Sequence, residues 1–235
     1  MLAKDMNRAT SKIKETLMKR IDYVLFDLDG TLTDPGIGIT NGVMFALNSF
    51  GIDVNDRSEL FRFIGPPLRD SFRDFYGMSA DEAELAVKKY REYYSVSGLF
   101  ENEVYPGVRD MLKELSSMGK KLAVATSKPT EFSVKILEHF GLLDHFAFVA
   151  GSEFDGTRDK KEDVIRFALK RLGIFDPSSA IMVGDRKFDI LGARTCGMDA
   201  IGVLYGYGDR CELNAAGAVA CAKDAFELNK LLTSL

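Results

Sequence analysis

Hydrophobic and polar positions divide the chain into regions with different periodicities. From about Tyr105 onward, short apolar runs alternate with longer segments whose apolar residues recur every three or four positions. The short runs are typical of buried strands and the longer segments of amphipathic helices. Such alternation predicts an α/β core built on a doubly wound, Rossmann-like parallel sheet. Strands are expected at residues 23–26, 121–125, 146–150, 180–183, 200–204 and 219–221.

The region from about Asn41 to Gly98 has no strand pattern. Its apolar residues follow helical spacing, and residues 79–82 (Ser-Ala-Asp-Glu) have the form of a capping box that opens a helix. Residues 33–40 contain a proline and two glycines, so we expect a loop there. The pattern predicts an all-helical module at residues 37–103, inserted into a core made of residues 21–36 and 104–235.

Two groups of side chains in this module have more than one interpretation. Tyr90, Tyr93 and Tyr94 are interpreted as packing residues of the helical bundle, because they lie at helical spacing with other apolar positions. Arg69 and Arg73 are four residues apart beside a Gly-Pro-Pro break. They are either surface charges or a clamp for an anionic substrate.

The first 20 residues are basic and form a separate segment. Their apolar residues recur at three- and four-residue steps, which predicts an N-terminal amphipathic helical extension docked on the surface. The segment has no continuous apolar region of the secretory type. Nowhere does the sequence reach the roughly 18 consecutive apolar residues of a membrane span. We therefore expect no membrane partner.

Composition narrows the functional classes further. The formal net charge of -4 gives no sign of the clustered basic surface that binds nucleic-acid polymers. Cys196, Cys211 and Cys221 are widely spaced, which argues against a disulfide framework and against a zinc cluster. These features indicate a reducing, cytoplasmic compartment. A monomer or a homodimer is expected.

The candidate chemistry begins where the first strand ends. Asp27 and Asp29 follow the apolar run directly, and residues two apart on a strand point the same way. Two carboxylates at close range repel each other unless a cation or a shared proton intervenes. The first strand therefore predicts a magnesium site beside a phosphate-binding cradle.

Other polar residues are expected at the same edge of the sheet. Thr126 and Ser127 follow a second strand, Asp185 follows a third, and Lys161 opens a helix. In open parallel sheets, ligands bind beyond the carboxyl ends of the strands. These residues should therefore converge on Asp27.

The residue types suit phosphoryl transfer. Asp27 can attack a phosphomonoester and form an acyl-phosphate, and Asp29 can act as general acid and base. Thr126 and Ser127 can bind phosphoryl oxygens, and Lys161 can place a positive charge beside them. Magnesium would take oxygens of Asp27 and Asp185 and the main-chain carbonyl of Asp29. Asp189 would hold the metal's waters or orient a neighbour, and Lys160 is the alternative to Lys161 as the phosphate-binding lysine.

Four stretches resemble, in order, the four motifs of the haloacid dehalogenase superfamily. They are DLDGT at residues 27–31, ATS at 125–127, the lysine of DKKED at 159–163, and GDRKFD at 184–189. FIGPPL, VATSKP, DGTR and GVLYGYG are similar to stretches of its phosphoglycolate phosphatase-like hydrolases, some described as 5′-nucleotidases. The resemblance covers the chain from residue 21 onward and implies that the helical module is a cap domain. It also implies Asp27 as nucleophile, Asp29 as acid/base, Thr126 and Lys161 as phosphate ligands, and Asp185 as a metal ligand.

The sequence therefore leads to a Mg²⁺-dependent phosphomonoesterase that acts on a small phosphorylated metabolite. Phosphoglycolate is the first expected substrate and nucleoside 5′-monophosphates are the second. A sugar phosphomutase shares nearly all of these residues and stays open, as does a non-catalytic regulator that retains the fold. A dehalogenase is disfavoured because Asp29 would have no proton to transfer.

Overall fold

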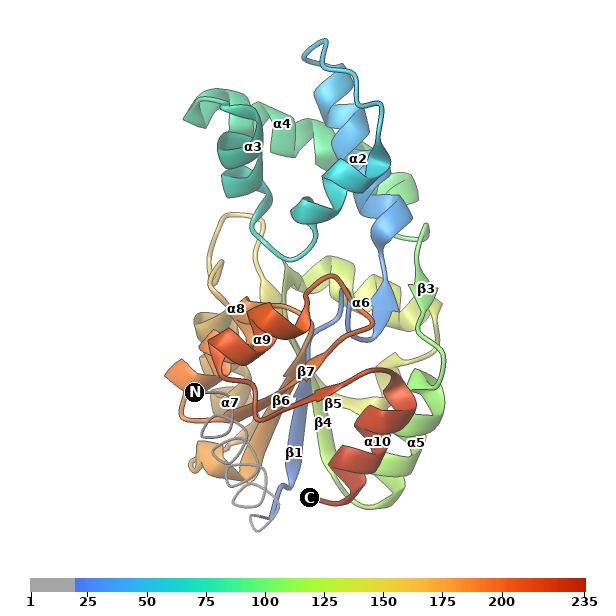
Figure 1. Cartoon of the computed structure of the whole chain (residues 1–235), viewed down its shortest axis with the longest axis vertical. Helices are drawn as coiled ribbons and strands as arrows, with labels where there is room; N and C mark the ends of the chain where they lie inside the picture. The colour runs from blue at the N-terminus through green and yellow to red at the C-terminus, as the bar shows by residue number, and fades with distance from the viewer. Residues whose placement is uncertain (1–19) are drawn as a thin grey trace.

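The computed structural model describes residues 20–235 as an α/β core with a helical cap above one edge of its sheet (Figure 1). Apart from Arg20, the helical extension predicted for residues 1–20 lies outside the described residues. Among residues 20–235, no helix is both long enough and apolar enough to cross a membrane.

A parallel sheet forms the centre of the core. Within the described residues it has six strands: β1 (Tyr23–Phe26), β4 (Lys121–Pro129), β5 (Phe146–Ser152), β6 (Ala180–Gly184), β7 (Asp199–Val203) and β8 (Ala220–Ala222). Their order is β5-β4-β1-β6-β7-β8. In β1, Phe26 is in register with Val124 of β4 and Val183 of β6. This order confirms the predicted doubly wound α/β core.

Helices cover both faces of the sheet. One face carries α5 (Val108–Ser117), α6 (Thr130–His139) and α10 (Ala225–Thr233), and the other carries α7 (Lys161–Leu172), α8 (Lys187–Thr195) and α9 (Arg210–Ala216). Val24 and Phe26 pack toward the first set and Leu25 toward the second. Successive strand residues face opposite sides of the sheet, and because helices cover both sides all three residues are fully buried. Short 3₁₀ turns, η3 (Leu143–His145) and η4 (Pro177–Ser179), precede β5 and β6.

The cap is built from helices that lie between β1 and β4 in the sequence. They are α2 (Gly36–Asn48), the 3₁₀ helix η1 (Arg57–Phe63), α3 (Leu68–Tyr76), α4 (Ala80–Tyr93) and the π-helical turn η2 (Tyr94–Gly98). The predicted capping box is confirmed, since Ser79 Oγ accepts from Glu82 N and Glu82 Oε2 accepts from Ser79 N at 2.8 Å. The described cap residues contain no strand before Glu103, as the sequence predicted.

The loop predicted for residues 33–40 is wrong. Thr33 and Asp34 form the short strand β2, and α2 begins at Gly36. Pro35 takes the N-cap position, where a proline costs no helical hydrogen bond. Gly38 serves packing here, because a Cβ on it would lie 2.1 Å from the main-chain oxygen of Gly98 in η2. Close approach of two cap segments, rather than chain flexibility, accounts for this glycine.

Core and cap are joined by two chain segments that lie side by side. β2 (Thr33–Asp34) pairs antiparallel with β3 (Glu103–Val104), with Thr33 opposite Val104. The pair lies beneath α2 at the edge of the molecule (Figure 1). We propose the predicted boundaries, residues 37–103, for the cap that these two segments carry.

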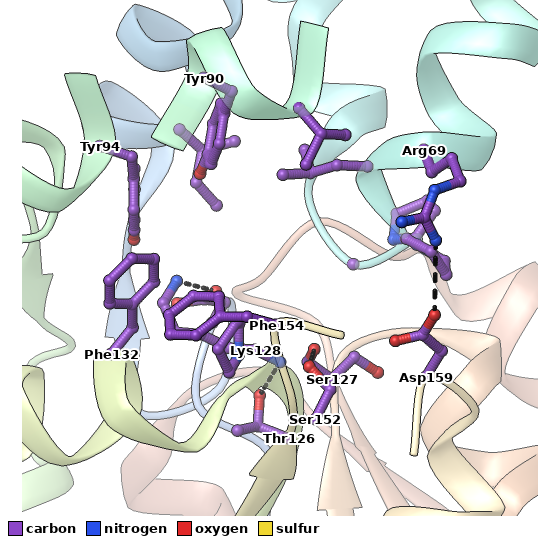
Figure 2. A pocket seen from close by; sticks show the side chains of 18 of the residues that line it. Arg69, Tyr90, Tyr94, Thr126, Ser127, Lys128, Phe132, Ser152, Phe154 and Asp159 are labelled. Atoms are coloured by element: carbon purple, nitrogen blue, oxygen red, sulfur yellow. Dashed lines mark hydrogen bonds and ion pairs between the residues drawn. The ribbon is translucent and has the colours of Figure 1, made fainter. Parts of the chain in front are cut away.

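An irregularity in β4 shapes the edge of the sheet below the cap. Ala125 pairs with Ala150, but the next pair is Pro129 with Ser152. Three residues of β4 therefore lie opposite Gly151, and the strand bulges between them. Bulges beside active sites re-aim side chains. This one turns residues 126–128 toward the space under the cap (Figure 2).

The bulge requires a glycine opposite it. A Cβ at Gly151 would lie 2.4 Å from the main-chain oxygen of Lys128, so we expect Gly151→Ala to destabilise the fold by about 1–3 kcal/mol. Ala147→Ser, at an exposed position of β5, is the control and should stay within about 0.5 kcal/mol. Urea denaturation measures both. Equal stability of the two variants would show that the bulge adapts without cost.

Candidate active site

The predicted site residues meet at the carboxyl edge of the sheet, under the cap. Asp27 and Asp29 follow β1, Thr126 and Ser127 lie in the β4 bulge, and Asp185 follows β6. Two further residues come from the first turns of helices: Lys161 begins α7, and Asp189 lies in α8. The described structure thus places together all seven residues that the sequence singled out.

Lys161 lies among the carboxylates. Its Nζ is 2.9 Å from Asp27 Oδ1 and 2.8 Å from Asp189 Oδ1, and its side chain is almost completely buried. Burial alone would lower the pKa of Lys161, but the Asp189 and Asp27 carboxylates raise it, so the ammonium stays charged. Lys160 is exposed at the N-cap of α7. The geometry therefore favours Lys161 over Lys160 as the lysine of the site.

Asp27 is held on one side only. Its Oδ1 accepts a hydrogen bond from the N–H of Leu28 at 2.8 Å and faces Lys161. Both contacts are to the same oxygen. The second carboxylate oxygen is therefore the one that can serve as a nucleophile.

Asp27, Asp185 and Asp189 form a buried acidic cluster. One oxygen from each lies within 4.8 Å of the others. Burial raises the pKa of Asp185 well above its usual range, and Asp189 and Asp27 raise it further. Burial likewise raises the pKa of Asp189 to about 6, against the lowering effect of Lys161. Such a cluster is costly unless a cation joins it.

The surroundings of Asp185 fit a metal ion. Its Oδ2 accepts from Tyr207 N at 2.8 Å, but its buried Oδ1 has no hydrogen-bond partner among residues 20–235. Gly30 has φ +80° and comes so close that a Cβ would lie 2.2 Å from Asp185 Oδ2. A buried, unpartnered carboxylate oxygen in an all-oxygen donor set suits Mg²⁺. Asp27 and Asp185 would hold the ion, and Asp189 Oδ1 contacts the Lys161 ammonium at 2.8 Å.

Asp29 is separate from this cluster. Its Oδ2 lies 2.5 Å from Lys128 Nζ, and its Oδ1 is buried without a partner among the described residues. Burial raises the pKa of Asp29 and the nearby Lys128 ammonium lowers it. The side chain of Asp29 thus lies outside the acidic cluster and is a candidate for proton transfer, while metal binding by its main-chain carbonyl stays a prediction.

Sequence reasoning missed Lys128. It follows Thr126 by two residues within the bulge, and its backbone N–H donates to Thr126 Oγ1 at 3.2 Å. Ser152 Oγ donates to the carbonyl of Ser127 at 2.8 Å and fixes the rest of the bulge. A lysine after a Thr-Ser pair at a strand's end was the available signal, but regular strand alternation does not show which way it points.

Aromatic side chains line the pocket between cap and core (Figure 2). Tyr90 stacks on Tyr94 with ring centroids 5.0 Å apart, Tyr94 contacts Phe132 at 5.7 Å, and Phe132 contacts Phe154 at 4.9 Å. Tyr90 and Tyr94 therefore pack as expected and also line the pocket. Tyr93 does not line it, and its hydroxyl donates to Glu101 instead.

Of the two arginines considered as a clamp, only Arg69 lines the pocket. It pairs with Glu84 at 2.7 Å and faces Asp159 of the core at 3.9 Å (Figure 2). Arg73 is exposed on α3, on the surface of the cap.

Comparison with known proteins agrees with this geometry. A family model described as haloacid dehalogenase-like hydrolase matches residues 24–203. A Pseudomonas aeruginosa 5′-nucleotidase is 45% identical over 92% of this chain and 97% of its own length. Phosphoglycolate phosphatase 1 of the same organism is 32% identical over 78% of this chain and 70% of its own. The crystal structure of a predicted phosphatase from Clostridium acetobutylicum superposes with a TM-score of 0.90 at 46% identity, covering 92% of this chain and all of that one.

Replacing Lys161 should lower the stability of the fold far more than replacing the adjacent Lys160. Lys161→Met leaves Asp27 and Asp189 buried without their ammonium and should destabilise the fold by about 3–5 kcal/mol. Lys160→Met changes an exposed side chain and should stay within about 0.5 kcal/mol. Denaturant unfolding of both variants measures the difference. Similar values would contradict the assignment of Lys161 to the site.

The acidic cluster should make the metal-free protein less stable as pH rises. Asp189 binds its proton more tightly in the folded chain, because its pKa there is about 6 against an ordinary 3.8. Its contribution to stability is therefore complete below pH 3.8 and is lost as pH rises through about 6. The raised pKa of Asp185 acts in the same direction. Thermal unfolding with a chelator, followed between pH 4 and 8, should show this decline.

Replacing Asp185 separates its stability cost from its function. Asp185→Asn removes a buried charge, so at pH 7 it should stabilise the metal-free protein by about 1–3 kcal/mol. The same variant should lose the rise in unfolding temperature that Mg²⁺ gives the wild type. An unchanged response to Mg²⁺ would remove Asp185 from the set of metal ligands.

Proposed function

The chain belongs to the family of haloacid dehalogenase-like hydrolases and is a phosphatase, and from this premise we propose a Mg²⁺-dependent phosphomonoesterase that works through a phospho-aspartate at Asp27. The observation that carries the proposal is the placement of Asp27. Lys161 and the N–H of Leu28 fix one of its oxygens, while Asp29 and the Thr126 bulge lie at the same edge of the sheet.

In the first half-reaction, Asp27 Oδ2 attacks phosphorus. A bond from this oxygen to phosphorus forms, the bond from phosphorus to the ester oxygen breaks, and Asp29 gives its proton to the leaving oxygen. The Thr126 hydroxyl, which already accepts from Lys128 N, donates its own hydrogen to a phosphoryl oxygen. Lys161 adds a fixed positive charge next to Asp27.

In the second half-reaction, Asp29 acts as the base. It takes a proton from a water molecule, the water oxygen attacks phosphorus, and the acyl-phosphate bond breaks. Inorganic phosphate leaves and the Asp27 carboxylate is restored. Mg²⁺, held by Asp27, Asp185 and the Asp29 carbonyl, would offset the negative charge of the phosphoryl oxygens.

The pocket walls favour nucleoside 5′-monophosphates as the substrate class. Tyr90, Tyr94, Phe132 and Phe154 form an aromatic lining on which a planar base can stack. The similarity to a 5′-nucleotidase over nearly its whole length supports the same substrates.

Phosphoglycolate, the first expectation from the sequence, is the second candidate. Its carboxylate needs a cation in the pocket, and the guanidinium groups that line the pocket are those of Arg69 and Arg91. Arg69 already pairs with Glu84 and faces Asp159, which reduces the charge that it can offer. One of the relatives is named a phosphoglycolate phosphatase, which supports phosphoglycolate as a candidate substrate.

Phosphate release from a panel of phosphomonoesters tests the proposal. The panel holds several nucleoside 5′-monophosphates, 2-phosphoglycolate and sugar phosphates, each with Mg²⁺ and with chelator. We expect release that needs Mg²⁺, and kcat/KM should be highest for a nucleoside 5′-monophosphate.

Two aspartate variants provide the controls. Asp27→Asn should lower kcat on the order of 10⁴-fold, while Asp53→Asn, at an exposed cap position, should leave it unchanged. Full activity of Asp27→Asn would contradict the proposed nucleophile. Isomerised sugar phosphate without phosphate release would indicate a mutase instead.

A further inference from the structure

Lys128 makes a second buried ion pair next to the one at Asp27. Its Nζ lies 2.5 Å from Asp29 Oδ2, and the two side chains are only 5% and 13% exposed. A buried ammonium loses its hydration, so its contacts must replace that loss. The β4 bulge brings Lys128 into this position, since its main chain is fixed through Thr126.

The other contact of the ammonium comes from the cap. Lys128 Nζ lies 4.8 Å from the ring centroid of Tyr94, a cation–π distance. Tyr94 begins η2 and stacks on Tyr90 of α4 (Figure 2). Lys128 thus bridges a residue of the core loop, Asp29, and a ring of the cap.

The two oxygens of Asp29 differ in their surroundings. Oδ2 is fixed by Lys128, whereas Oδ1 is buried and has no hydrogen-bond partner in the part of the chain that the structure describes. Anchoring one oxygen sets the direction of the other. The unpartnered oxygen is the one that can handle a proton during the reaction.

We propose that Lys128 is a positioning residue: it anchors Asp29 Oδ2 so that Oδ1 meets the ester oxygen of the substrate, and Tyr94 holds Lys128 in place when the cap lies on the core. This inference rests on the proposed function. It makes the alignment of the proton donor depend on a contact between cap and core. Lys128 itself forms and breaks no covalent bond.

The dependence on the leaving group distinguishes positioning from a general structural role. An alkoxide leaving group needs a proton from Asp29, whereas p-nitrophenolate is stable enough to leave without one. Misplacing Asp29 should therefore slow the first half-reaction of a nucleoside 5′-monophosphate far more than that of p-nitrophenyl phosphate. A variant that merely weakens the fold would slow both alike.

The experiment measures KM and, at saturating substrate, the rate constant for release of nucleoside or p-nitrophenolate in the first turnover, for the wild type, Lys128→Met, Lys128→Arg and Asp29→Asn. This first-turnover rate constant reports the first half-reaction alone, whereas kcat also includes the release of phosphate from Asp27, which is common to both esters. General acid–base catalysis contributes about 10²–10⁴-fold, so Asp29→Asn gives the upper limit of the effect. Lys128→Met should lose at least about tenfold more in the first-turnover rate constant on the nucleotide than on the aryl ester. Lys128→Arg should recover part of this difference because it keeps the positive charge.

Variants of Tyr94 test the cap contact without touching Lys128, and decide the matter if Lys128→Met does not fold. Tyr94→Leu removes the ring and should lower the ratio of the nucleotide to the aryl-ester first-turnover rate constant. Tyr94→Phe keeps the ring and should retain the wild-type ratio.

Three outcomes would overturn the inference. Equal losses on both substrates would assign Lys128 to the fold, and a change confined to KM would assign it to substrate binding. An unchanged ratio in Tyr94→Leu would show that the contact between Tyr94 of the cap and Lys128 does not affect the position of Asp29. If the wild type hydrolyses neither ester, the proposed function itself fails, which differs from a variant losing an activity that the wild type has.

Discussion

The main physical constraint on this structure is that it places four buried or nearly buried carboxyl groups at one edge of a sheet. Among the described residues, Asp27, Asp29, Asp185 and Asp189 converge there, and Lys128 and Lys161 face them. With all four ionised, the two ammonium groups would leave two negative charges, which one divalent cation would balance. Burial raises the pKa values of Asp185 and Asp189, and the neighbouring carboxylates raise them further. Metal affinity and the cost in stability therefore have the same physical origin.

The fold arranges these charges by separating them into two ion pairs. Lys161, from α7, lies between Asp27 and Asp189, while Lys128, from the β4 bulge, takes Asp29 away from the cluster. The proposed nucleophile and the proposed proton-transfer group are thus held by different elements of the core. The cap joins the second pair through Tyr94, so the position of the cap bears on the proton donor rather than on the nucleophile.

Much of this arrangement could be predicted from the sequence because it follows from rules of regular structure. The same-edge rule for parallel strands gave the meeting of Asp27 with Thr126 and Asp185. Strand alternation did not give the direction of Asp29, because β1 ends at Phe26 and the Asp29 carboxylate pairs with Lys128, away from the acidic cluster. Helical spacing to Val164 and Ile165 pointed to Lys161, which turns inward while Lys160 stays exposed. What could not be predicted depends on irregular or long-range geometry. The bulge that turns Lys128 inward breaks strand alternation, and the placement of Tyr90 and Tyr94 over the pocket depends on how the cap sits.

The central claim is that Asp27 carries the phosphoryl group between the two half-reactions, and one measurement tests it most directly. Asp29→Asn should slow the release of phosphate from the intermediate, so this variant is mixed with Mg²⁺ and an aryl phosphate, quenched in acid and digested for peptide mass spectrometry. The account predicts one added phosphoryl group on the peptide that contains Asp27, sensitive to hydroxylamine and absent when Asp27→Asn is added to the variant. Product formed in the first turnover with that peptide unmodified, or a phosphoryl group on another residue, would contradict it.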